Sequence, residues 1–210
     1  MSIPRHKVFI SYYNEDDKEY KNHLIKMNEL NKNTWKEQSI FEECSFHEDE
    51  IDDTGLTDNQ IRRIIRDKYI KDATVFILLC GQNTKYIDYL DWEIFTAMCD
   101  SKNNRQLGLL VINLPTIKQS VRSGSDDEKP LLSDNANWYS CPNRTEFEKI
   151  YPFVPSRIID NFYKHVPITV VNWDRIRCNT RRLKQLINNA YNRRFDCKYE
   201  VSAPLKRANL

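Results

Sequence analysis

Residues 74–80 read TVFILLC, a continuous apolar segment that is rich in β-branched and aromatic side chains. Such a segment is typical of a parallel strand that helices cover on both faces. Two further segments, HKVFISY at 6–12 and LGLLVINL at 107–114, predict buried strands of the same kind. Several such strands along one chain indicate an α/β sheet, because parallel strands are joined by crossover connections that usually contain a helix.

The segments between these strands carry helical patterns. Apolar residues recur at helical spacing over residues 14–30, where Asn14 or Asp16 is expected to be the N-cap. Thr57 is expected to begin a second helix, and residues 88–100 predict a third. The alternation predicts a central parallel sheet with right-handed connections and helices on both faces.

Two weaker strands complete the predicted sheet. Residues 39–45 favour a short strand, and residues 166–171 (VPITVV) predict the last one. Asp174 is expected to cap a final helix. The apolar positions of that helix are Leu183, Leu186, Ile187, Ala190 and Tyr191.

Between residues 115 and 155 this alternation is interrupted. Several prolines divide the region, and residues 119–129 are polar and charged with no apolar period. We therefore predict a surface excursion here. With 210 residues the chain is expected to form a single domain over residues 1–210, with a loop excursion at about 115–160.

The glycine content excludes the common phosphate-binding loops. The chain has four glycines, and no two of them lie within ten residues of each other. Walker loops and dinucleotide fingerprints need closely spaced glycines, so that the backbone can approach a phosphate group. If the protein handles a nucleotide, it does so without either loop.

Charge and targeting signals indicate no nucleic acid and no membrane. The 32 basic and 30 acidic residues nearly cancel, and the acidic segment 42–53 and the basic segment 175–198 are expected to be solvated faces. His47 lies among acids but lacks the spacing of a calcium loop, so no metal site is predicted. The longest apolar run has six residues and no signal segment leads the chain. A cytoplasmic protein with reduced cysteines is expected.

One carboxylate stands out at the carboxyl ends of the predicted strands, where open parallel sheets bind ligands. Glu93 lies on the helix after the most buried strand, next to Trp92 and one turn after Tyr89. A carboxylate beside aromatic surfaces can stabilise a cationic transition state while the rings exclude water. An acid in the first half of a helix is also favoured by the helix dipole, so the residues alone leave both interpretations open.

Several ordered blocks of the sequence resemble a known family. They include HKVFISYYNEDDKEYKNHL from residue 6, IDDTGLTDNQIRRIIRDKYIKDATVFILLCG from residue 51 and YLDWEIFTAM from residue 89. Later blocks such as PSRIIDNF and ITVVNWD extend the likeness over nearly the whole chain. Together they resemble the bacterial TIR-like family that includes the ThsB proteins of Thoeris anti-phage systems.

This resemblance implies a flavodoxin-like fold and an NAD-cleaving enzyme without a cofactor, for which NAD is the substrate. It implies that Glu93 is the catalytic residue and that Ser11, Tyr12, Tyr13, Ser45 and Trp92 are candidates for substrate binding. The loop 44–53 corresponds to the family's mobile loop. The implied product is a cyclic or conjugated ADP-ribose signal that activates an effector protein, and self-association is expected.

Two other functions remain compatible with the residues. The chain could be a non-catalytic TIR interaction module that signals by self-association. It could also be another flavodoxin-like enzyme that processes nucleosides, such as a base-exchange transferase with a glutamate nucleophile.

Overall fold

The computed structural model describes residues 4–32, 39–45, 55–101, 105–118, 124–132 and 141–205. Five parallel strands in these segments form one sheet in the order β2-β1-β3-β4-β5. The strands are β1 (Lys7–Ser11), β2 (Glu42–Glu43), β3 (Val75–Cys80), β4 (Gly108–Asn113) and β5 (Thr169–Asn172). This order is that of flavodoxin-like sheets. In such sheets the strand order reverses between β1 and β3, at the switch point.

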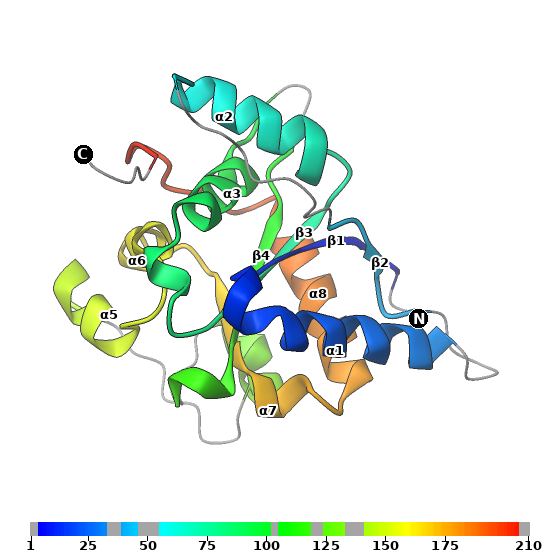
Figure 1. Cartoon of the computed structure of the whole chain (residues 1–210). Helices are drawn as coiled ribbons and strands as arrows, with labels where there is room; N and C mark the ends of the chain where they lie inside the picture. The colour runs from blue at the N-terminus through cyan, green and yellow to red at the C-terminus, as the bar shows by residue number, and fades with distance from the viewer. Residues whose placement is uncertain are drawn as a thin grey trace.

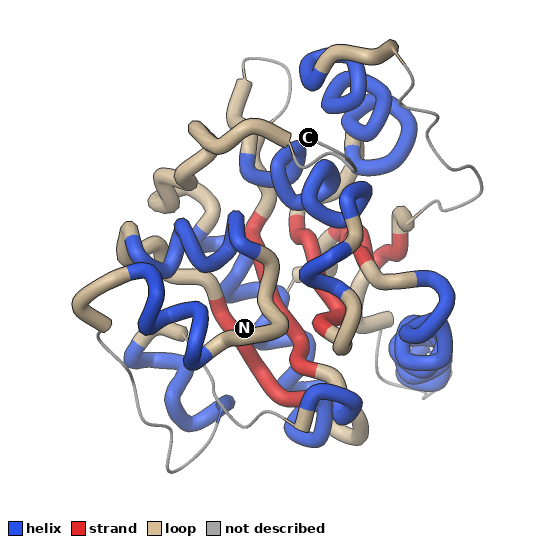
Figure 2. The backbone as a smooth tube through the Cα atoms, turned by 60° about the vertical axis from the view of Figure 1, so that its left-hand side comes forward, coloured by secondary structure: helices blue, strands red, loops and turns tan. Residues whose placement is uncertain are grey.

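Helices cover both faces of the sheet (Figures 1 and 2). Helices α2, α3 and α6 pack on one face, and α1, α7 and α8 pack on the other. The helices are α1 (Asn14–Lys32), α2 (Asp58–Ile65), α3 (Asp88–Met98), α4 (Lys129–Leu132), α5 (Arg144–Ile150), α6 (Ser156–Tyr163), α7 (Trp173–Ile176) and α8 (Thr180–Arg193). The predicted α/β class with helices on both faces is confirmed.

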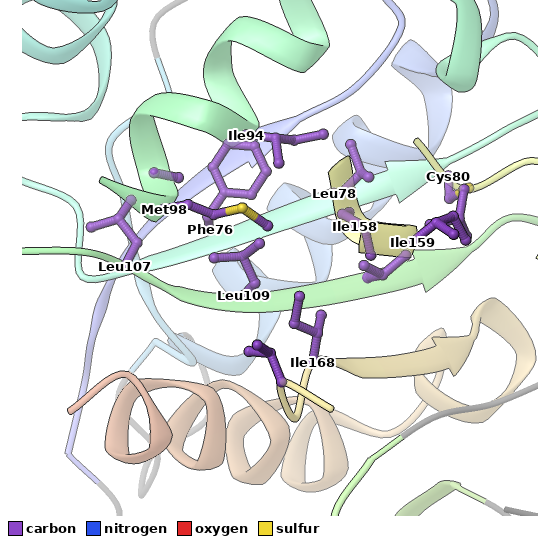
Figure 3. Close-up of a cluster of buried hydrophobic side chains, with 14 of the residues drawn as sticks. Phe76, Leu78, Cys80, Ile94, Met98, Leu107, Leu109, Ile158, Ile159 and Ile168 are labelled. Atoms are coloured by element: carbon purple, nitrogen blue, oxygen red, sulfur yellow. The ribbon is translucent and has the colours of Figure 1, made fainter. Parts of the chain in front are cut away.

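Strand β3 shows why a fully apolar segment was needed at the centre of the sheet. Phe76, Leu78 and Cys80 point to the face covered by α3 and α6, where Figure 3 shows them with Ile94 of α3. The alternate residues of the strand belong to the core under α1 and α8. Since both faces are buried, neither set of side chains can be polar.

Local capping sets where two of the helices begin. Thr57 caps α2, because its side chain accepts from the Gln60 backbone while the Gln60 side chain bonds back to the Thr57 backbone. The expected cap at Asp174 is wrong. Asp174 lies inside the short helix α7, and the Asn179 side chain accepts from Arg182 N at 2.8 Å to start α8.

The predicted surface excursion over 119–129 is wrong for Glu128; residues 119–123 lie outside the described residues. Glu128 has no exposed surface, forms an ion pair with Arg193 at 2.8 Å and accepts from Thr169 at 2.6 Å. Asn189 of α8 donates to its other oxygen at 3.1 Å. A charged residue can be buried when its partners satisfy it, and those partners come from β5 and α8, far along the chain.

All six cysteines are free, and several are buried. In the segments that the structure describes, no helix combines the length and the apolar character that a membrane crossing requires.

Replacing Gly108 by Ala is expected to destabilise the protein by about 3 kcal/mol or more. Helix α8 crosses β4 so closely that an added Cβ would lie 2.1 Å from the backbone oxygen of Ala190. Denaturant unfolding measures the loss. The control is Gly55→Ala, which meets no atom within 4 Å and changes only a backbone with φ of +74°. Its cost should be about 1–2 kcal/mol. Equal losses for the two variants would contradict the close approach.

Candidate functional site

Ser11 and Glu93 are in contact between β1 and β3, where the strand order of the sheet reverses. Ser11 is the last residue of β1, opposite Leu78 of β3, and Glu93 lies in the second turn of α3. The Ser11 hydroxyl donates to Glu93 Oε2 at 2.6 Å. The fold therefore brings together two predicted site residues that are 82 positions apart, at the place where flavodoxin-like sheets bind their ligands.

Burial gives Glu93 an unusual protonation state. Its exposed fraction is 7%, and removal from water raises its pKa to about 8, while the hydrogen bond from Ser11 opposes this rise. A glutamate at the surface, with an ordinary pKa of 4.5, would be ionised at neutral pH. Glu93 differs because α3 places its side chain in the interior.

A second carboxylate on α3, that of Asp91, has a cationic partner, which Glu93 lacks among the described residues. Asp91, two residues earlier, forms a bidentate ion pair with Arg157 of α6, with both N–O distances at 2.9 Å. The same guanidinium donates to the backbone oxygens of Ala203 and Pro204 and lies over the Phe95 ring. The guanidinium of Arg157 thus binds Asp91 and residues 203–204 of the C-terminal segment. Within the described residues, Glu93 has a hydroxyl partner and no ion pair.

Three tyrosines, Tyr12, Tyr13 and Tyr89, lie at the turn between β1 and α1, next to Ser11. The Tyr89 hydroxyl lies 3.4 Å from Asn14 N, which donates to it, and 3.3 Å from Tyr12 O, which accepts from it. Tyr89 of α3 therefore links α3 to the turn that follows β1. Tyr12 is buried, whereas Tyr13 is half-buried and its hydroxyl donates to Glu15 at 2.5 Å. Burial raises the pKa of Tyr12, and the nearby Glu93 contributes to that rise.

The other two predicted substrate-binding residues, Ser45 and Trp92, make contacts that stabilise the fold. The Ser45 hydroxyl accepts from Ile10 N at 2.7 Å and continues the β1–β2 ladder. Trp92 is buried in the core between α3 and the sheet. The predicted mobile loop begins at Cys44 and Ser45, and its remaining residues, 46–53, lie outside the described residues.

Sequence reasoning missed a second buried carboxyl group at this edge of the sheet. Asp17 of α1 is 2% exposed, and burial raises its pKa to about 6. Its carboxylate fills the space beside Gly81, where an added Cβ would lie 2.5 Å from Oδ1. The pairing of Asp91 with Arg157 was missed as well. Neither has a local signal, because each depends on a partner that is distant in the sequence.

A comparison with protein families identifies the family of the chain. The sequence model of the family described as "Thoeris protein ThsB, TIR-like domain" matches residues 9–119, more than half of the chain. The chain belongs to this family. The matched region contains the end of β1, all of β2, β3 and β4, and both residues of the Ser11–Glu93 pair, so the candidate site lies within the ThsB TIR-like domain. No curated protein matches the chain.

Replacing Glu93 by Gln is expected to stabilise this TIR-like domain by a margin that grows with pH. The pKa of Glu93 is about 8 in the folded state against an ordinary value of 4.5, so between these values only the folded state holds the proton. The unfolding free energy of the wild type should therefore fall by about 1.4 kcal/mol per pH unit in that range. The neutral amide carries no such dependence.

Urea unfolding at several pH values between the two pKa values measures this margin. Glu29→Gln, on the exposed surface of α1, is the control and should show no growing gain. A Glu93→Gln margin that stays constant with pH would show that the carboxyl group is not buried as described.

Replacing Arg157 by Met is expected to cost about 3–5 kcal/mol, because it leaves Asp91 buried without its cation. Adding Asp91→Leu should recover part of the loss. The control, Arg177→Met, breaks an ion pair whose side chains are 56% and 74% exposed. It should cost less than about 1 kcal/mol in the same denaturant unfolding experiment. Similar losses for the two arginines would argue against the buried pair.

Proposed function

We propose that the chain cleaves the bond between nicotinamide and ribose in NAD, with Glu93 as the catalytic residue. The observation that carries the proposal is the position of Glu93: a buried carboxyl group with one hydroxyl donor, at the switch point of a TIR-like sheet. Carboxyl groups with a strongly perturbed pKa and no ion-pair partner are candidates for functional sites. Asp91, its neighbour on the same helix, has a structural partner in Arg157.

The chemistry requires the ionised form of Glu93. When the C–N bond breaks, its electron pair stays with nicotinamide, which leaves as a neutral molecule and needs no proton. The ribose becomes positively charged, as in glycoside cleavage, and a carboxylate beside it lowers the energy of that state. A cationic nicotinamide ring also favours the ionised carboxyl group before the bond breaks. Water or a nucleophile of the product itself then captures the ribose.

Ser11 supports this step by donating a hydrogen bond to the carboxylate. Such a bond holds one oxygen of Glu93 at a defined position and stabilises its charge. We assign Ser11 as a positioning residue and retain Tyr12, Tyr13, Ser45 and Trp92 as candidates for substrate contact. The product proposed is a cyclic or conjugated ADP-ribose signal that activates an effector protein in Thoeris anti-phage defence, in the cytoplasm and in a self-associated form.

Loss of NAD on incubation with the protein tests the proposal. The wild type is expected to consume NAD, and Glu93→Gln should reduce the rate by at least about 100-fold, which corresponds to about 2.7 kcal/mol of lost stabilisation. Mass spectrometry of the products distinguishes hydrolysis from cyclisation or conjugation. Glu29→Gln is the matched control and should retain the wild-type rate.

The assay also separates the other candidate functions. Equal NAD consumption by wild type and Glu93→Gln would remove Glu93 from the mechanism. No consumption by a self-associated wild-type protein would favour a non-catalytic interaction module. A covalent glycosyl-enzyme formed with a nucleoside would favour base exchange.

A further inference from the structure

Among the residues that the structure describes, no cation pairs with Glu93. Helix α6 supplies Arg157, which is committed to Asp91. Strand β1 supplies the Ser11 hydroxyl, which donates to Glu93 at 2.6 Å. Helix α2 packs against the same face of the sheet as α3 through buried isoleucines. Glu93 is therefore a buried acid whose described hydrogen-bond partner is a hydroxyl group.

Two phenols in the described part of the chain lie close enough to Glu93 to be affected by its charge. Glu93 acts electrostatically on Tyr12 and on Tyr89, and in both residues it adds to a rise in the phenol pKa that burial causes first. Phenols with raised pKa values are neutral at physiological pH, so they supply no positive charge. A carboxylate in this position would be a buried charge without a counter-ion, which is costly. A neutral carboxylic acid would not.

We propose that Glu93 makes the site selective for positively charged ligands: it is a neutral acid in the unliganded protein, and binding of a cation releases its proton to the solvent. The inference rests on the proposed function because it takes the Glu93 site as the ligand site. The step is balanced: the carboxyl O–H bond breaks, the proton goes to the buffer, and the resulting carboxylate is paired with the cation. No bond forms to the ligand.

Two consequences follow for a ligand with a pyridinium ring. Its affinity rises with pH as long as Glu93 must lose a proton to bind it, and it levels off once the carboxyl group is already ionised. A neutral ring of the same shape gains nothing from the carboxylate. The site thus distinguishes an oxidised, cationic nicotinamide from an uncharged one through a single proton. Burial raises the pH at which that happens, and the Ser11 hydrogen bond lowers it because the bond favours the ionised form.

The test uses two probes that cannot be cleaved like NAD: the 1-methylnicotinamide cation and neutral nicotinamide. Isothermal titration calorimetry in buffers with different enthalpies of protonation counts the protons released on binding. At neutral pH the cation is expected to release close to one proton, and nicotinamide none. The Kd of the cation should fall about tenfold per pH unit until the pH nears the pKa of Glu93, then become constant. The Kd of nicotinamide should not fall.

Three variants complete the experiment. Glu93→Gln should abolish proton release and remove the preference for the cation. Ser11→Ala should move the levelling of Kd to higher pH. Asp17→Asn removes another buried carboxyl group at the same edge of the sheet and should leave proton release unchanged. Urea unfolding confirms that each variant is folded before it is titrated.

Several results would overturn the inference. They are a cation Kd that does not change with pH, proton release that persists in Glu93→Gln, and a cation that does not bind at any pH. These results are distinguishable from a failure of the proposed function. NAD cleavage that depends on Glu93, with no proton released on cation binding, overturns this inference alone. Proton-coupled binding of the cation without NAD cleavage overturns the proposed reaction alone.

Discussion

The parallel ladder between β1 and β3 is the constraint from which the candidate site follows. It pairs Val8 with Val75 and Ser11 with Leu78, so the two strands end close together and the chain leaves them on opposite sides of the sheet. Helix α1 follows β1 onto one face, and α3 follows β3 onto the other. A side chain at the end of β1 can then meet the second turn of α3. The contact between Ser11 and Glu93 is a consequence of strand order.

The two buried acids of helix α3 differ in the partners that their carboxylates have. Asp91 is satisfied by a guanidinium that also binds the C-terminal segment, and this arrangement joins α3, α6 and residues 203–204. Glu93 receives one hydroxyl hydrogen bond. The charge of Asp91 is paired, whereas a charge on Glu93 would oppose folding, and proteins retain such a buried group mainly where it acts on a ligand. By this difference Asp91 is a structural acid, and Glu93 is the candidate for a functional one.

Distant partners explain where sequence reasoning failed. Residues 119–129 have no apolar period, and nothing near Glu128 shows that Arg193, Asn189 and Thr169 will surround it. Asp174 and Asn179 are both ordinary helix-capping residues, and the turn at α7 decided which of them starts α8. Strand β2 is two residues long, shorter than the predicted 39–45, because only Glu42 and Glu43 pair with β1.

By itself, the sequence determined the α/β class, the buried strands, the position of α3 and the choice of Glu93 as the residue to examine. Apolar runs and helical spacing carry that information locally, since a strand covered on both faces has to be apolar along its whole length. The tertiary structure alone decided the protonation of Glu93, its partner Ser11 and the diversion of Arg157 to Asp91. Each of these depends on which distant groups share a water-free space, because burial and pairing set the energy of a charge, and spacing along the chain does not specify either.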